Sequence, residues 1–146
     1  MAITSAICNS FKQEILEAEH NFTASTGNTF NLALYTSSAT LNKSTTAYSS
    51  SNEITNSSGT AYSAKGKALT SVTPTLSTDT AVCDFADVSW TSASFTANGC
   101  LIFNDSHSTD ASVCAIAFGS DKTVTSGTFT IQFPAAAATT AIIRIA

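Results

Sequence analysis

The two histidines are the residues of this chain best suited to acid–base chemistry. His107 lies in the segment Asn104–Asp110, which places hydroxyl and carboxylate side chains beside an imidazole. A hydrolytic triad assembles those groups in space from rigid elements, and the chain has no Gly-x-Ser-x-Gly elbow to present a nucleophile. We therefore interpret this segment as a solvated hairpin turn. His20 is expected at the C-terminus of a helix, where the helix dipole favours it.

Carboxylates and thiols offer possible metal ligands. Asp105 with Asp110, and Asp84 with Asp87, have no EF-hand spacing, so we interpret them as acidic turn residues. The four cysteines form no Cys-x-x-Cys pair and no zinc-type Cys/His spacing, which favours buried or reduced thiols. They are Cys8, Cys83, Cys100 and Cys114. We accordingly assign no catalytic, cofactor-binding or metal-binding residue, and we expect neither a cofactor nor enzymatic activity.

The composition narrows the class of protein. The chain has 146 residues, a net charge of −4 and only 11% charged residues, while Ser and Thr make up about a third of it. Nucleic-acid binding requires a basic stripe, which five lysines and Arg144 do not provide. No apolar run approaches the length of a membrane span, and the first twenty residues lack the pattern of a signal peptide. We expect a weakly charged protein made in a cytosol, with neither nucleic acid nor membrane as a partner.

Apolar residues at three- and four-residue steps predict one helix, over residues 3–20. Its apolar face consists of Ile3, Ile7, Phe11, Ile15, Ala18 and Phe22. Polar residues at positions 12–14 and 17 cover the opposite face. The helix is expected to end near Glu19 or His20, because turn-forming residues begin at Asn21.

Alternating apolar residues after this helix predict strands. The expected strands cover 29–36, 65–74 (ending at Pro74), 81–90 (with a bulge or bend at 86–87), 95–103, 112–118, 128–133 and 141–145. Asn98-Gly99 is compatible with a type I′ hairpin or a glycine bulge, and the unbroken alternation favours one long strand. Residues 119–127 are expected to form a polar turn. A polar excursion covers residues 37–63, with Tyr48, Ile54 and Tyr62 as anchors.

These elements predict a mainly β protein and a single domain over residues 1–146. Residues 29–146 are expected to form an antiparallel two-sheet β-sandwich, immunoglobulin-like or jelly-roll-like, with the helix on an edge or an open end. Trp90 continues the core alternation after Val88, so we assign it to the core. The alternative interpretation places Trp90 and the three tyrosines on a sugar-binding platform.

A series of short segments, taken in order, resembles a family of small virion proteins of tailed bacteriophages. The segments are Phe11–Leu16, His20–Phe22, Asn28–Phe30, Ala33–Tyr35, Asn52–Ile54, Phe85–Trp90, Ala97–Gly99, Ile102–Phe103, Phe118–Lys122 and Phe129–Pro134. The resemblance spans nearly the whole chain. It implies a structural component of a particle with an immunoglobulin-like or jelly-roll sandwich, and it supplies no catalytic motif.

The resemblance implies a capsid decoration, or cement, protein that bridges major capsid subunits on the head exterior. The expected partners are the major capsid protein and copies of the chain itself, as a dimer or a trimer. A tail or head–tail connector protein and a host-glycan binding module are the alternatives. We expect contacts from the helix face, the excursion 37–63 and the terminal strand 141–146, although the apolar stripe of the helix also suits the domain's own core.

Overall fold

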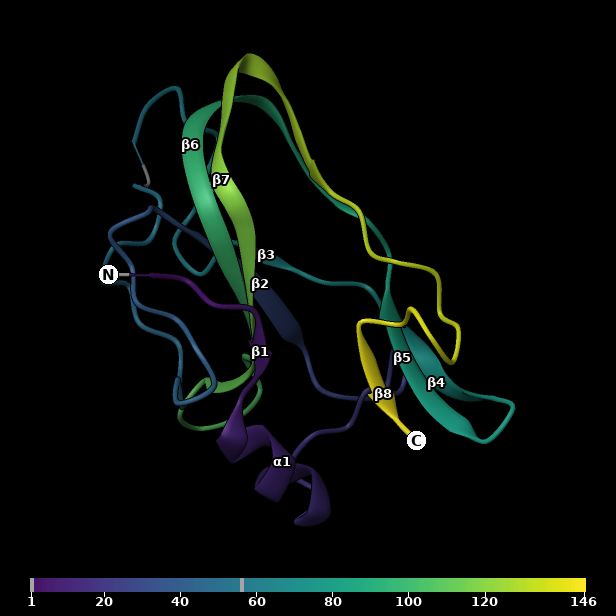
Figure 1. Ribbon diagram of the computed structural model, residues 1–146. Coiled ribbons are helices and arrows are strands. Elements are labelled where there is room, and N and C mark those ends of the chain that lie inside the picture. Colours follow the sequence, from purple (N-terminus) through teal and green to yellow (C-terminus); the bar gives the residue numbers. More distant parts are fainter. Residues whose placement is uncertain (1, 56) are drawn as a thin grey trace.

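The computed structural model describes residues 2–55 and 57–146 and contains two antiparallel sheets and one short helix (Figure 1). The elements in chain order are β1 (Ala6–Ile7), α1 (Asn9–Leu16), β2 (Phe30–Tyr35), β3 (Lys67–Ala68), β4 (Ser71–Ser77), β5 (Thr80–Phe85), β6 (Val88–Asn104), β7 (Ala111–Ile131) and β8 (Ile143–Ile145). The large sheet has the order β1-β7-β6-β2-β3, and the small sheet has the order β4-β5-β8. The predicted mainly β, two-sheet sandwich with one N-terminal helix is confirmed.

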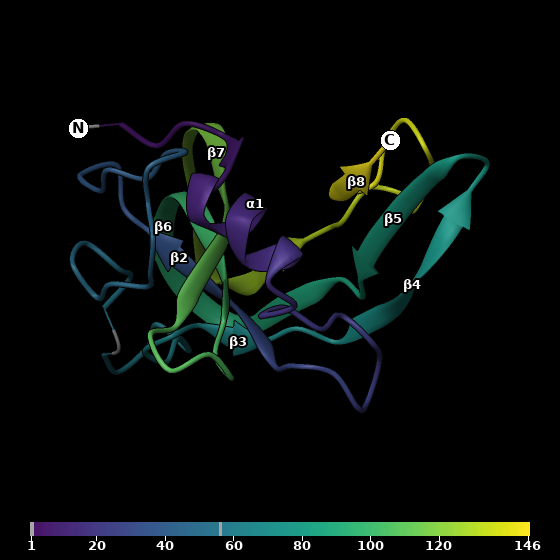
Figure 2. The ribbon, with the colours of Figure 1, turned by 90° about the horizontal axis from the view of Figure 1, so that it is seen from below.

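The larger of two clusters of buried apolar residues lies between the two sheets, with α1 at one end of it (Figures 1 and 2), and the smaller cluster lies on the opposite face of the large sheet. Phe11 is the buried residue of the helix. It packs edge-on against Phe22, whose ring stacks on Phe30 of β2 at 4.2 Å between centroids. Of the two positions expected for the helix, an edge or an open end of the sandwich, the structure has the open end (Figure 1).

The predicted extent of the helix, residues 3–20, is wrong. The helix covers only Asn9–Leu16, because the residues before it pair with strands. Ile3 forms a bridge with Leu41, and β1 pairs with β7 through Ala6 and Ala115. Ala18 has a positive φ of 60°, which ends helical geometry shortly after Leu16. The apolar stripe at helical spacing thus serves two elements, since tertiary strand pairing overrides local propensity.

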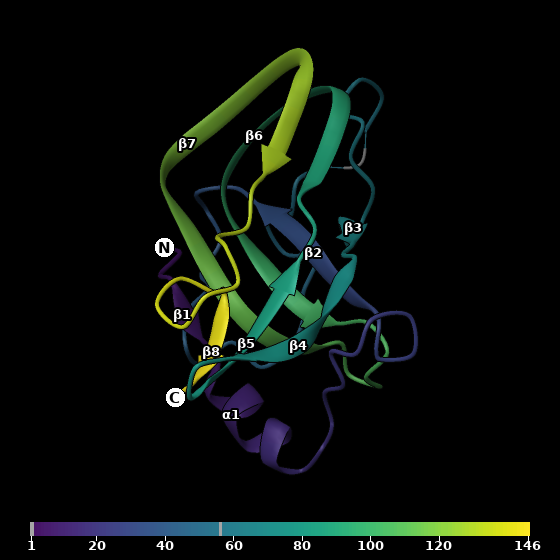
Figure 3. The same ribbon diagram turned by 90° about the vertical axis from the view of Figure 1, so that its right-hand side faces the viewer.

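β6 and β7 form a long hairpin that bends back on itself (Figure 3). The prediction of one long strand through Gly99 is confirmed, because β6 runs from Val88 to Asn104. A Cβ at Gly99 would lie 2.6 Å from the carbonyl oxygen of Ile116, so the neighbouring backbone approaches too closely for a side chain.

The predicted turn at 119–127 is wrong, because β7 is continuous from Ala111 to Ile131. Residues 118–121 stand opposite Asn98 alone, and this bulge changes the direction of the strand while the ladder resumes at Lys122. Asn98 Nδ2 donates to Asp121 Oδ1 at 2.8 Å across the bulge. Gly119, with a φ of 78°, supplies a conformation that other residues adopt with strain.

The predicted strand 65–74 divides between the sheets, with β3 in the large sheet and β4 in the small one. Pro74 does not end a strand. It lies inside β4, an edge strand whose pairing shifts between Val72 and Thr75, and this irregularity accommodates a residue without an N–H. The predicted bend at 86–87 is the point where the chain returns from β5 to β6 of the large sheet.

The polar excursion 37–63 is fastened by the three predicted anchors. Ile54 and Tyr62 are buried, and the Tyr48 ring stacks on Phe103 at 4.8 Å. Both tyrosine hydroxyls donate to Glu53, at 2.7 Å from Tyr62 and 2.6 Å from Tyr48. The segment therefore adds side chains to the core, although its described residues form isolated bridges and no strand.

Candidate functional site

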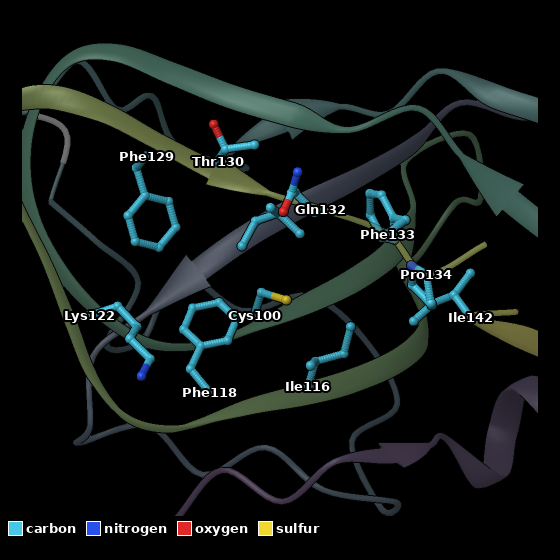
Figure 4. A pocket seen from close by; sticks show the side chains of 11 residues that line it. Cys100, Ile116, Phe118, Lys122, Phe129, Thr130, Gln132, Phe133, Pro134 and Ile142 are labelled. Atoms are coloured by element: carbon cyan, nitrogen blue, oxygen red, sulfur yellow. The ribbon is translucent and has the colours of Figure 1, made fainter. Parts of the chain in front are cut away.

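An apolar pocket of about 540 Å³ lies inside the bend of β7 (Figure 4). It is lined by Cys100, Ile116, Phe118, Lys122, Phe129, Thr130, Ile131, Gln132, Phe133, Pro134 and Ile142. This volume falls within the range of small-ligand and side-chain pockets in proteins, roughly 300–1,000 Å³. Most of the lining is aromatic or aliphatic, so the pocket suits an apolar group.

The bent strand surrounds the pocket and supplies both of its walls. Ile116 and Phe118 precede the bulge, and Phe129 and Ile131 follow it on the returning half of β7. Figure 4 shows the chain passing round the pocket, with Phe118 and Phe129 facing each other. Their ring centroids are 6.2 Å apart. The pocket therefore depends on the bend and is absent from a straight hairpin.

Three polar or charged side chains at the pocket come from β7 and from the residue that follows it. They are Lys122, Thr130 and Gln132. The Lys122 ammonium donates to Ser120 Oγ at 3.0 Å and forms no ion pair with the described residues. The pocket thus combines an apolar interior with one cation that lacks a counter-ion.

Two smaller pockets extend this hollow along the same side of the sandwich. A pocket of about 320 Å³ lies between β1 and Ile142, and one of about 340 Å³ lies beside Arg144 and the C-terminal Ala146. Ile142 lines all three pockets. We call this surface, from Phe129 through Ile142 to Ile7, the open side.

The open side also presents unpaired backbone. β1 pairs only with Cys114 and Ala115, so residues 118–131 of β7 have β6 on one side and no second neighbour among the described strands. Such an edge carries free N–H and C=O groups next to the apolar lining. A covering protein segment would find both hydrogen-bond partners and apolar contacts there.

The structure brings both histidines together at the other end of β6. Their rings stack at 6.2 Å between centroids. His20 is buried, with Nε2 at 2.8 Å from Glu14 Oε2 and Nδ1 at 3.1 Å from Asn104 Nδ2. The expected position of His20 at the helix C-terminus is wrong, because the helix ends at Leu16. Since both ring nitrogens of His20 have protein partners, the side chain fastens the segment after α1 to β6.

His107 has neighbours of the types found in a triad, but their arrangement is that of a turn. Its Nε2 lies 3.3 Å from Glu19 Oε2, and its Nδ1 lies 3.0 Å from Thr109 Oγ1. The backbone N–H of Thr109 also donates to Nδ1, at 3.3 Å, so the hydroxyl belongs to a local turn. The predicted turn between β6 and β7 is confirmed, with His107 half-buried rather than fully solvated.

The carboxylate pairs considered as calcium ligands have other partners. The Lys65 ammonium lies 2.8 Å from both Asp105 and Asp110, and these hydrogen bonds raise the pKa of Lys65 above its ordinary value. Asp84 accepts from the N–H of Phe85, and Asp87 accepts from that of Phe133. Within residues 2–55 and 57–146 there is no cluster of three or more His, Cys, Asp or Glu that could hold a metal.

The four cysteines are free thiols, as predicted. Cys8, Cys100 and Cys114 are buried, and desolvation raises the pKa of each thiol, to about 12 for Cys114. Desolvation also raises the pKa of half-buried Cys83, to about 11. A reactive cysteine requires a lowered pKa, so this environment favours inert thiols.

Trp90 is 1% exposed, which confirms its assignment to the core. Its ring lies 6.0 Å from Tyr62 and meets Phe95 and Phe129 edge-on. Tyr35 and Tyr62 are buried as well, so these rings cannot form the sugar-binding platform considered from the sequence.

The pocket was not predicted from the sequence. Phe118 and Phe129 were visible as apolar positions in two expected strands, but the turn predicted between them gave no reason to place their rings across a cavity. The signal was present in the chain as aromatic residues on both sides of a Gly-containing polar segment.

No helix in the described residues is long and apolar enough to cross a membrane. Comparison with known proteins finds no matching family model, no matching curated protein and no matching solved structure.

Proposed function

We propose that this chain is a structural protein of bacteriophage virions, and that it decorates the capsid exterior by bridging major capsid subunits. The ordered series of segments that resembles small virion proteins supports this proposal. The structural observation that carries it is the open side, where apolar pockets lie next to the unpaired edge of β7. Unpaired strand edges are sites at which further chains add to a sheet.

The weakly charged surface supports a role in protein packing. Only 11% of the residues are charged, and Ser and Thr supply much of the remaining polarity. Hydroxyl groups form hydrogen bonds to a neighbouring subunit without the large desolvation cost of a buried charge. Repeated over a shell, modest contacts of this kind give strong overall binding through avidity.

The histidine cluster argues against an enzyme. Both nitrogens of His20 are occupied inside the protein, and His107 is held in a turn by Glu19 and Thr109. A general base needs an accessible nitrogen within reach of its substrate. We therefore propose a structural role without catalysis, and no glycan-binding role, since Trp90 is buried.

The experiment that tests the proposal is the copy number of the chain in purified phage particles, measured by quantitative mass spectrometry. On the order of hundreds of copies per particle supports decoration, since avidity requires a repeated contact. Roughly six or twelve copies, the stoichiometry of closed rings, would favour the alternative of a tail or head–tail connector protein. Particles without the chain would refute a virion role altogether. A particle reconstruction would then give the position of the chain on the head.

A further inference from the structure

The small sheet carries an exposed apolar row that is a counterpart to the pocket. Leu76 is 74% exposed and pairs with Ala81, which pairs in turn with Ile145, itself 58% exposed. These three residues lie side by side across β4, β5 and β8. Cys83 follows Ala81 by two residues and Ile143 precedes Ile145 by two, so these side chains lie on the same face of the small sheet. Cys83 and Ile143 pack against the core. The core-facing side of the small sheet thus continues beyond the core and is left uncovered at the tip of the β4–β5 hairpin.

An unpaired acid stands at the same tip. Asp79 lies in the turn between β4 and β5, is exposed, and forms no ion pair with the described residues. The tip therefore combines an apolar row with one anion, and the pocket combines an apolar interior with one cation, Lys122. Leu16 on α1 is also exposed, but Glu17 beside it accepts a hydrogen bond from Gln13, so that position offers no free acid.

We propose that the pocket inside the bend of β7 receives the β4–β5 hairpin tip of a second copy of this chain. Leu76 then enters the apolar interior, and Asp79 lies against Lys122. Figures 1 and 3 place the hairpin tip and the bend of β7 at opposite ends of the molecule, so one chain cannot close this contact on itself. Complementary charges at the edge of an apolar contact fix its register and disfavour other partners.

The contact joins two different surfaces, so two copies either exchange tips reciprocally in a two-fold dimer or repeat the contact head to tail, which leaves one free tip and one free pocket at the ends of an open chain. Such contacts build rings when the rotation closes and open chains when it does not. This inference rests on the proposed function and deepens it, since it assigns the pocket to a contact between copies of the decoration protein and leaves the unpaired edge of β7 for capsid subunits. It concerns the purified chain, however, so its failure would leave the copy number in particles unaffected.

The test is the association of the purified chain, measured by sedimentation velocity at several concentrations and salt strengths. Asp79→Lys and Lys122→Asp each place like charges together and are expected to weaken self-association by about tenfold or more. The double variant restores an opposite pair in the reversed orientation, so it is expected to recover most of the wild-type association. The matched control combines Asp79→Lys with Lys43→Asp. It makes the same two charge changes, but the new acid lies away from the pocket, so the self-association of this variant is expected to stay as weak as that of Asp79→Lys alone.

Leu76→Ser supplies a second test that does not depend on charge. The side chain is largely exposed, so an unchanged melting temperature is expected together with weaker association. A wild-type chain that stays monomeric up to millimolar concentration would overturn the proposal. So would a double charge variant no stronger than the single variants, or association that persists in Leu76→Ser. Binding of dodecanoate to a monomer, lost in Lys122→Asp, would assign the pocket to a small amphiphile instead and would also overturn it.

Discussion

Replacing Trp90 with alanine is expected to destabilise the fold by about 3–5 kcal/mol. The indole is 1% exposed and packs against the rings of Tyr62, Phe95 and Phe129. A buried tryptophan removes about 150–250 Å² from water, which corresponds to about 4–6 kcal/mol at ~25 cal/mol per Å². This loss is a large part of the stability of a small domain, about 5–15 kcal/mol, so the variant is expected to be clearly less stable than the wild type.

The assay is equilibrium unfolding in urea followed by circular dichroism, together with a thermal scan in which the melting temperature is expected to fall by about 10 °C. Trp90→Phe is the matched control. It keeps an aromatic ring in the site and removes an indole N–H that is buried without a hydrogen-bond partner among the described residues, so its cost is expected to stay below about 1.5 kcal/mol. A loss below about 1 kcal/mol for Trp90→Ala would refute the reasoning, because the strand phase that buries the ring would then be incorrect.

Three further predictions concern other parts of the fold. Tyr62→Phe removes the hydroxyl that accepts a hydrogen bond from the buried N–H of Leu34 at 2.9 Å. The free energy of unfolding in urea is therefore expected to fall by about 1–3 kcal/mol, and an unchanged value would contradict this. Gly66→Ala places a Cβ 1.8 Å from the carbonyl oxygen of Leu32 in β2. Gly59 also has a positive φ but has open space around it, so Gly66→Ala is expected to lower the free energy of unfolding by at least about 2 kcal/mol more than Gly59→Ala. Equal losses of stability in the two variants would contradict the clash. Because burial raises the pKa of the Cys83 thiol to about 11, the unfolded state loses this proton first above pH 9, so the free energy of unfolding is expected to fall between pH 9 and about 11. Cys83→Ala should flatten that decline, and an unchanged slope would exclude this thiol as a cause.

The two-sheet architecture was predictable because its signal is local. Successive side chains of a strand point to opposite faces, so apolar residues recur at every second position. The run from Phe95 to Phe103 therefore indicated one long strand through Gly99. The same alternation placed Trp90 in the core. The two points where the chain passes from one sheet to the other were only partly predictable. The break in alternation at 86–87 marked the return from β5 to β6, but nothing in the alternation showed that residues 65–74 divide between β3 and β4.

The errors have a common cause, which is pairing between distant segments. Ile3 and Ile7 have helical spacing with Phe11, but Leu41 and Cys114 draw them into bridges and a strand. His20 was expected at a helix end, yet its position depends on Asn104, 84 residues away. No local rule contains such partners, and their hydrogen bonds outweigh the weak preference of a few residues for one conformation.

The sequence by itself determined the alternation of apolar residues along the strands, the place of Trp90 in the core and the low content of charged residues, because each follows from residue type and spacing. Only the tertiary structure decided that residues 119–127 are a bent strand rather than a turn. The ladder with β6 is irregular at residues 118–121, opposite Asn98, and again at residues 124–129, opposite Trp90–Phe95, and the strand bent in this region sets Phe118 against Phe129. The pocket, and with it the surface offered to a second copy, exists because β7 stays paired with β6 on both sides of these irregularities.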